Sequence, residues 1–259
     1  MLHEACRIML SNIEKNMILG RVTEQWDTYL SAPAMNLQMF NKAVGKEGGH
    51  QLADSVDTLT TSVINASFPT ASGFQRKNGK VSPRSMGDIW FRNLRQEWNP
   101  INVKTGLVGS EGQPNIVSLK KLLGGIINRT LDSYYLLMVK FEVNKREKRI
   151  LHHVYLTDML DWLSLPKEQY VITFDSGPGQ TMLKAKQFFE LLNGGFCPPR
   201  MSIREKVSRL MDLYEDGERR LRENRERDLK KFRSKYNAFL NDESPFQIDI
   251  SRQVEFEIE

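Results

Sequence analysis

Apolar residues recur at three- and four-residue spacing over the first 66 positions, which is the period of a helix that buries one face. In residues 1–45 these apolar positions are Ile8, Met9, Ile13, Met17 and Ile18. After a glycine break at 45–49, the same spacing returns from His50 to Ala66 with Leu52, Val56, Leu59, Val63 and Ile64. The sequence therefore predicts an N-terminal helical region and a second helix. A loop rich in Gly, Pro, Ser and Lys is predicted to follow at 68–85.

Past residue 85 the apolar pattern becomes typical of strands. Strands are predicted at 88–94, 100–105, 133–143, 150–156 and 170–174. Helices are predicted at 116–123, 158–163 and 181–192, the first capped by Asn115 and stopped by Gly124 and Gly125. Strands that alternate with helices predict an α/β fold with one central mixed sheet flanked by helices.

The chain ends in a long charged helix, predicted at 203–240, and in an alternating apolar segment at 246–258 that predicts one or two strands. We divide the chain into an N-terminal helical region at 1–45, a core at 46–200 and a C-terminal region at 201–259. The charged helix is interpreted either as a solvated or partner-facing helix or as a basic edge against phosphate. The second interpretation uses Arg219, Arg220, Arg222, Arg225, Lys230 and Lys231.

The composition narrows the class of protein. With 40% hydrophobic and 27% charged residues, the chain resembles an ordinary globular protein. It has no apolar run near the roughly 20 residues that span a bilayer, and no signal peptide is expected at its start. Two cysteines argue against a disulfide scaffold or a cysteine zinc site, so we expect the cytoplasm. The net charge of +5 is compatible with a polyanionic partner.

Candidate chemistry lies in the segment Gly87 to Gly106. Asp88 opens one predicted strand, and Asn102 and Lys104 lie two apart in the next, so their side chains share one face. A hairpin that turns near residues 95–96 brings Asp88 opposite Asn102. A carboxylate and an amide oxygen suit a hard cation such as Mg²⁺, and an ammonium group can assist phosphodiester hydrolysis. The alternative is an exposed cross-strand ion pair between Asp88 and Lys104.

This pattern resembles the PD-(D/E)xK nucleases, and within that superfamily the chain is similar to type II restriction endonucleases. An Asp, a spacer of about a dozen residues and an acidic-x-Lys strand form the family's signature. Gly87 stands where proline is common, and Asn102 replaces the usual acid. The resemblance implies that Asp88 and Asn102 bind Mg²⁺ and that Lys104 is catalytic. Asp54 or Asp57 on the preceding helix is a candidate additional ligand.

The resemblance also implies a function and partners. We expect site-specific, Mg²⁺-dependent hydrolysis of double-stranded DNA that leaves 5′-phosphates, by a homodimer in a prokaryotic cytoplasm. Such an enzyme belongs to a restriction-modification pair, because host DNA must be protected by methylation. The alternatives are a repair or transposition nuclease of the same fold and a non-catalytic basic DNA-binding protein.

Candidate DNA contacts come from two places outside this segment. One is the basic loop before the catalytic strand, with Arg76, Lys77 and Lys80. The other is the turn after the strand at 170–174, with Gln180 and, just beyond it, Lys184. Either place is equally consistent with an ordinary solvated loop or tight turn.

Overall fold

A computed structural model describes residues 12–45, 48–67, 71–72, 87–92, 98–108, 114–129, 131, 133–175 and 179–241. The chain divides into two compact units, Met1–Gly217 and Glu218–Glu259. The expected strands at 246–258 and the basic loop with Arg76, Lys77 and Lys80 lie outside the described residues. Within the described part, no helix is both long enough and apolar enough to cross a membrane.

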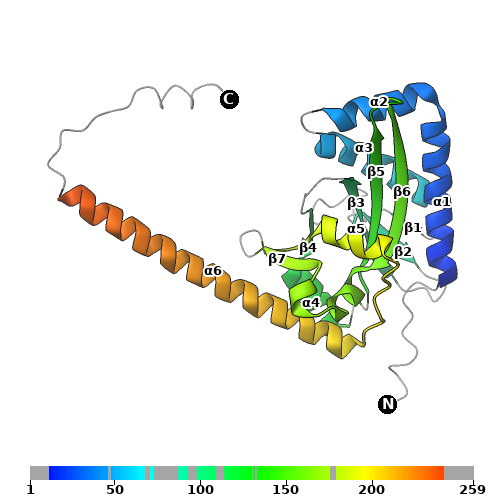
Figure 1. Ribbon diagram of the computed structural model, residues 1–259. Coiled ribbons are helices and arrows are strands. Elements are labelled where there is room, and N and C mark those ends of the chain that lie inside the picture. Colours follow the sequence, from blue (N-terminus) through cyan, green and yellow to red (C-terminus); the bar gives the residue numbers. More distant parts are fainter. Residues whose placement is uncertain are drawn as a thin grey trace, which may run out of the picture. The chain divides into compact units, whose positions relative to one another are not determined.

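A five-stranded mixed sheet forms the centre of the first unit (Figure 1). Its order is β1-β2-β3-β5-β6, and the strands are β1 (Ala71–Ser72), β2 (Ile89–Arg92), β3 (Trp98–Leu107), β5 (Tyr135–Asn144) and β6 (Arg149–Asp158). Only β3 and β5 are parallel, and the other neighbours are antiparallel. The strongly apolar β5 occupies an interior position, as its sequence predicts, because both of its faces are covered.

Three helices cover one face of this sheet: α1 (Asn12–Ser31), α2 (Pro33–Val44) and α3 (Gly48–Ser67). Their buried residues, such as Trp26, Leu52 and Val56, pack in one cluster with Ile101 and Val103 of β3. These helices confirm the predicted helical region for residues 12–44 and the second predicted helix. The alternation along β3 therefore sends Ile101 and Val103 toward the helices and Asn102 and Lys104 toward the opposite face.

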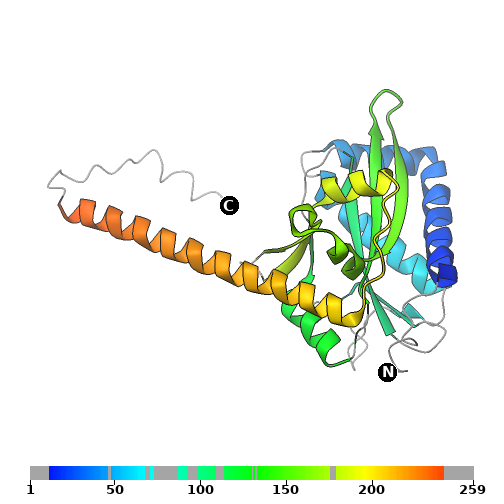
Figure 2. The same ribbon diagram turned by 60° about the horizontal axis from the view of Figure 1, so that its bottom comes forward.

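The opposite face is covered by a second cluster, whose elements lie in Figure 2 on the side of the central sheet away from α1. It contains the three-stranded sheet β4-β8-β7, with β4 (Asn115–Ser118), β8 (Gln180–Leu183) and β7 (Ile172–Asp175). The helices are α4 (Leu119–Ile127), the 3₁₀ helices η1 (Met159–Ser164) and η2 (Lys167–Gln169), α5 (Ala185–Asn193) and the start of α6 (Ile203–Leu240). The described strands thus form two sheets, and the expectation of a single sheet is wrong.

Two predicted helices begin in the wrong place because their first residues are strands of the small sheet. Residues 115–118 form β4, so Asn115 is not a helix cap, and α4 begins at Leu119 and continues through Gly124 and Gly125 to Ile127. Residues 180–183 form β8, and α5 begins only at Ala185. The Thr181 hydroxyl joins both strands, because it donates to the carbonyl of Val117 and accepts from its N–H. Such pairing between distant segments overrides local helix periodicity.

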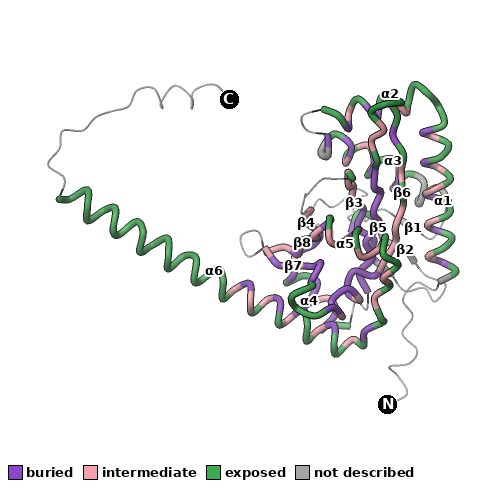
Figure 3. Tube along the Cα trace, in the orientation of Figure 1, coloured by how far each residue is buried: buried purple, intermediate pink, exposed green. Residues whose placement is uncertain are grey.

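The second unit contains the remainder of α6, from Glu218 onward. Every residue from Arg222 to Asn241 is exposed (Figure 3). Arg219 and Glu223 form an exposed ion pair at 3.0 Å, one turn apart, which contributes little to stability. The long charged helix predicted at 203–240 is confirmed with the same bounds.

Candidate active site

Asp88 lies directly before Ile89, the first residue of β2. The register Ile89–Ile101 is the last pair of the two strands. The Asp88 N–H donates to the Ile101 carbonyl at 3.0 Å, and one carboxylate oxygen of Asp88 accepts from the Val103 N–H at 2.7 Å. These two bonds join Asp88 to Ile101 and Val103, the residues on either side of Asn102, and so hold Asp88 opposite Asn102, as the predicted hairpin requires.

Gly87 helps Asp88 to approach β3 closely. A Cβ atom built on Gly87 would lie 3.1 Å from the Ile101 carbonyl oxygen and 3.1 Å from the Cβ of Pro100. Any larger residue would push this backbone away from β3 by a few tenths of an ångström. The glycine at position 87 therefore has a local steric reason.

Asn102 is almost entirely buried, with 5% of its surface exposed. Its Nδ2 donates to the Ile116 carbonyl of β4 at 3.2 Å, and this bond fixes which side of the amide carries the oxygen. The Oδ1 atom is buried and has no hydrogen-bond partner among the described residues. Buried carbonyl oxygens usually have a donor, so this atom has capacity for one further partner, such as a water molecule or a ligand.

Tyr134 lies against the same amide, although the sequence gives no reason to select it for the site. It is fully buried, as expected for a core residue, and it precedes β5 beside β3. Burial raises the pKa of its hydroxyl, the charge of Asp88 raises it further, and a hydrogen bond with the Asn102 side chain acts in the opposite direction. Tyr134 thus remains a neutral phenol that helps to orient Asn102.

Asp57 brings a second carboxylate to Asp88. It follows the buried Val56 on α3, the helix that packs on β3. Part of its side chain is exposed, yet burial of the carboxyl raises its pKa to about 6, and the charges of Asp88 and Asp54 add to this effect. The charge of Lys104 opposes the rise, so all four ionisable groups lie close enough to interact. Of the two acids named from the sequence, Asp57 is therefore the one most strongly coupled to the site.

Lys104 is half-buried on β3, opposite Met138 of β5 and on the same face as Asn102. In the described part of the chain no ion pair within 4.0 Å joins it to Asp88, and the alternative of a cross-strand ion pair stays a prediction. The charges of Asp88 and Lys104 both act on Asp57, in opposite directions. The structure thus brings Asp88, Asn102 and Lys104 together and adds Asp57 and Tyr134.

The other expected DNA contacts lie on different elements. Gln180 is on β8, where it pairs with Ser118 of β4, and Lys184 precedes α5. The Lys184 N–H donates to the Val171 carbonyl, and its own carbonyl accepts from Phe188. Both residues are half-buried. Their positions are those of residues that hold β8 and α5 in place, and a role in DNA binding stays a prediction.

The described residues contain no group of three or more His, Cys, Asp or Glu side chains arranged to hold one metal ion. The available donor set is instead one carboxylate, from Asp88, and one neutral oxygen, from Asn102, with Asp57 nearby. Comparison of the sequence with models of known protein families gives no match, and no curated protein matches it significantly.

Proposed function

We propose that the chain is a Mg²⁺-dependent endonuclease that hydrolyses phosphodiester bonds of double-stranded DNA at the site of Asp88, Asn102 and Lys104. The observation that carries the proposal is the buried, unpartnered Oδ1 of Asn102 beside the Asp88 carboxylate. Most buried polar atoms have a hydrogen-bond partner, so this oxygen is a candidate position for a ligand.

The donor set fits Mg²⁺. This cation prefers oxygen ligands and keeps several of its waters, so one or two carboxylates with a neutral oxygen are sufficient on the protein side. Asp88 and Asn102 would hold it, and Asp57 would add charge directly or through a water molecule. When bound, the cation would polarise the scissile phosphate and lower the pKa of a water molecule.

The protein's own residues account for the rest of the reaction. Lys104 presents a positive charge to the negative charge that develops on the phosphoryl oxygens as water adds and the 3′-oxygen leaves. The phosphate remains on the 5′ side, and the water gives up one proton to the solvent and one to the departing 3′-oxygen. Asp57 and Asp88 keep the site negative and attract the cation, and Tyr134 and Ile116 hold the Asn102 amide in position.

Two further features support a restriction-endonuclease-like protein. The elements follow one another as helix α3, antiparallel pair β2–β3, helix α4 and strands β5–β6, with Asp88 at a strand start and Asn102-x-Lys104 within the next strand. The net charge of +5 favours a polyanionic substrate. A two-fold symmetric DNA site is best bound by a two-fold symmetric protein, so the proposed enzyme is a homodimer. It would act in the cytoplasm of a prokaryote that protects the same site by methylation.

The experiment is plasmid cleavage by the full chain with Mg²⁺, with and without EDTA. We expect discrete fragments that carry 5′-phosphates, and we expect no cleavage with EDTA. Lys104→Ala should remove the activity, whereas Lys145→Ala, an exposed lysine in the β5–β6 turn, should retain it. DNA binding without cleavage under any of these conditions would overturn the proposal in favour of a non-catalytic binder. A continuous smear would favour a structure-directed repair or transposition nuclease.

A further inference from the structure

We propose that the end of α6 pairs with the same segment of a second copy of this chain, through an apolar seam formed by Leu229, Phe232 and Tyr236. The inference does not depend on the proposed nuclease function, because it concerns only the second unit of the chain. We call these three residues the C-terminal seam.

The seam consists of large apolar side chains that are more than half exposed. Leu229 is 52% exposed, Phe232 66% and Tyr236 60%. Their spacing of three and then four residues puts them on one side of the helix, the pattern of helices that pair in coiled coils. Figure 3 shows this part of α6 exposed all along its length. A contiguous exposed apolar stripe with a polar rim is typical of an interaction surface.

The charges beside the seam favour a second copy over another partner. In a parallel pair, Leu229 and Tyr236 occupy one set of central positions and Phe232 the other. Asp228 then flanks the seam on one side and Arg233 on the other, five residues later, so that Asp228 of each chain faces Arg233 of the other. Lys230 and Lys231 fall on the outer side of the helix. The surface is therefore complementary to itself, although this end of the helix is basic.

The same geometry explains where the seam begins. One heptad earlier, the central positions hold Arg222 and Arg225. Like charges at those positions repel one another across a parallel pair, so pairing should be confined to the last turns of α6. Replacement of both by leucine should extend the seam and tighten the dimer.

The experiment is sedimentation equilibrium of the full chain over a range of concentrations. We expect a monomer–dimer equilibrium for the wild type. The double variant Leu229→Gln and Phe232→Gln should raise the dissociation constant by about 100-fold, since two large apolar side chains lose their burial. The control, Lys231→Gln with Ser234→Gln, changes the outer face of the same turns and should leave the dimer unchanged.

A charge exchange tests the orientation of the pair. Asp228→Arg alone and Arg233→Asp alone should each weaken the dimer, and the two changes together should restore it. A wild type that stays monomeric at every concentration, or a dimer that is unaffected by the seam variant, would overturn the proposal. A monomer that binds vesicles of anionic lipid through the seam would assign this surface to a membrane instead. A wild-type protein that forms the dimer but does not cleave DNA would contradict only the proposed nuclease function.

Discussion

At the scale of single residues, the site depends on the oxygen of one amide. Asn102 uses Nδ2 to bind the Ile116 carbonyl, and its Oδ1 has no hydrogen-bond partner among the described residues. Asn102→Asp would place a charged oxygen against that carbonyl, and we expect the metal-free protein to lose about 1–3 kcal/mol of unfolding free energy. The added charge should tighten Mg²⁺ binding by roughly tenfold, about 1.4 kcal/mol, as measured by calorimetric titration.

Two outcomes of that experiment are informative. If the variant folds and binds Mg²⁺ more tightly, the amide oxygen is a ligand. If it folds but shows neither Mg²⁺ binding nor cleavage, Asn102 has a different role, such as a contact with the substrate. Asn102→Leu serves as the matched control, because it removes the oxygen and nearly preserves the volume.

Asp57 gives a pH-dependent prediction. Its folded-state pKa is about 6 against an ordinary value of 3.8, so the folded protein binds this proton more tightly than the unfolded chain does. The stability of the metal-free protein therefore falls as pH rises from about 4 to 6 and stays lower above that range. Asp57→Asn should stabilise the metal-free protein at pH 8 by up to about 1 kcal/mol, a small value because the side chain is partly exposed to solvent. At pH 4 the same change should have little effect.

Thermal unfolding at the two pH values measures this effect, with Glu168→Gln as a control at an exposed position outside the site. Addition of Mg²⁺ should raise the melting temperature of the wild type more than that of Asp57→Asn, because the cation relieves the repulsion between Asp57 and Asp88. Equal Mg²⁺ effects on both proteins would mean that Asp57 does not contribute to cation binding.

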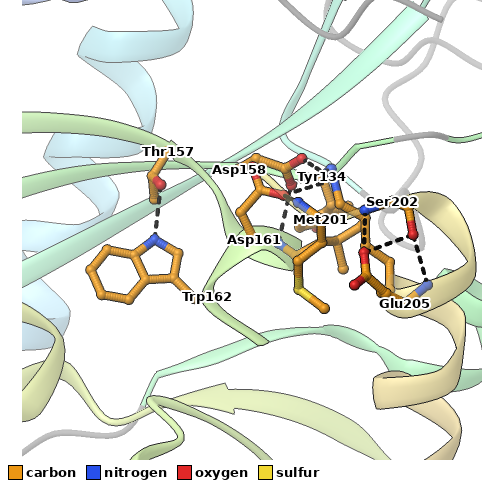
Figure 4. A network of polar contacts seen from close by, with 10 residues as sticks. Tyr134, Thr157, Asp158, Asp161, Trp162, Met201, Ser202 and Glu205 are labelled. Atoms are coloured by element: carbon orange, nitrogen blue, oxygen red, sulfur yellow. Dashed lines mark hydrogen bonds and ion pairs between the residues drawn. The ribbon is translucent and has the colours of Figure 1, made fainter. Parts of the chain in front are cut away.

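At the scale of elements, a buried ion network ties the start of α6 to the central sheet (Figure 4). Lys206 is 1% exposed and donates to Asp158 at 2.8 Å, and it lies 3.1 Å from Asp161. Asp158 also accepts from the N–H groups of Tyr134 and Leu160. This network therefore joins β6, η1 and α6, and it fixes the backbone of the tyrosine whose side chain meets Asn102.

Removal of the lysine should be strongly destabilising. Burial alone lowers the pKa of Lys206, but Asp158 and Asp161 outweigh this effect and raise it, so the ammonium group stays charged. Lys206→Met leaves the buried carboxylate of Asp158 and the half-buried carboxylate of Asp161 without a cation, and we expect a loss of about 3–5 kcal/mol of unfolding free energy. The loss should be larger at pH 8 than at pH 5, because the stranded carboxyl groups can take up protons at lower pH.

Urea unfolding at both pH values measures this loss, and Lys186→Met on the exposed side of α5 is the control. A loss below about 1 kcal/mol would place the Asp158–Lys206 pair among ion pairs that contribute little. A loss that does not depend on pH would mean that the carboxylates find other partners.

Much of the central sheet could be predicted from the sequence, because its strands are long, apolar and locally regular. β5 is a continuous apolar run, as expected of a strand that is buried on both faces, β6 is rich in β-branched and aromatic residues, and α6 has the length and composition of a solvated helix. The small sheet could not be predicted, because β4 and β8 are short and are held by pairing between residues more than 60 positions apart. Each of these strands directly precedes a helix, and the helical spacing of apolar residues extends backward from the helix into the strand. The predicted helices therefore begin too early.

The candidate site also has a part that could be predicted from the sequence and a part that could not. The hairpin register that brings Asp88 to Asn102 follows from the spacing of the two strands, and the coupling of Asp57 follows from its place on the preceding helix. Tyr134 could not be selected, since an aromatic residue before a buried strand is ordinarily a core residue. Its link to the site arises only because β5 lies parallel to β3, a pairing between segments about 34 positions apart that local sequence does not determine.

At the scale of the whole molecule, the basic charge should be visible in the salt dependence of DNA binding. A dimer that neutralises about 8 phosphates would give a slope of log K against log salt concentration near −7. Fluorescence anisotropy with a labelled duplex, in EDTA to prevent cleavage, measures this slope. A slope close to zero would mean that the net positive charge does not face DNA.

Measurement of cleavage and DNA affinity on the same variants tests whether Asp88, Asn102 and Lys104 hydrolyse DNA. We expect Lys104→Ala and Asp88→Asn to slow Mg²⁺-dependent plasmid cleavage by at least about 100-fold, the usual effect of removing one charge-stabilising group. Both variants should bind duplex DNA as tightly as Lys145→Ala and the wild type. Cleavage at the wild-type rate by Lys104→Ala, with unchanged folding and affinity, would contradict the account.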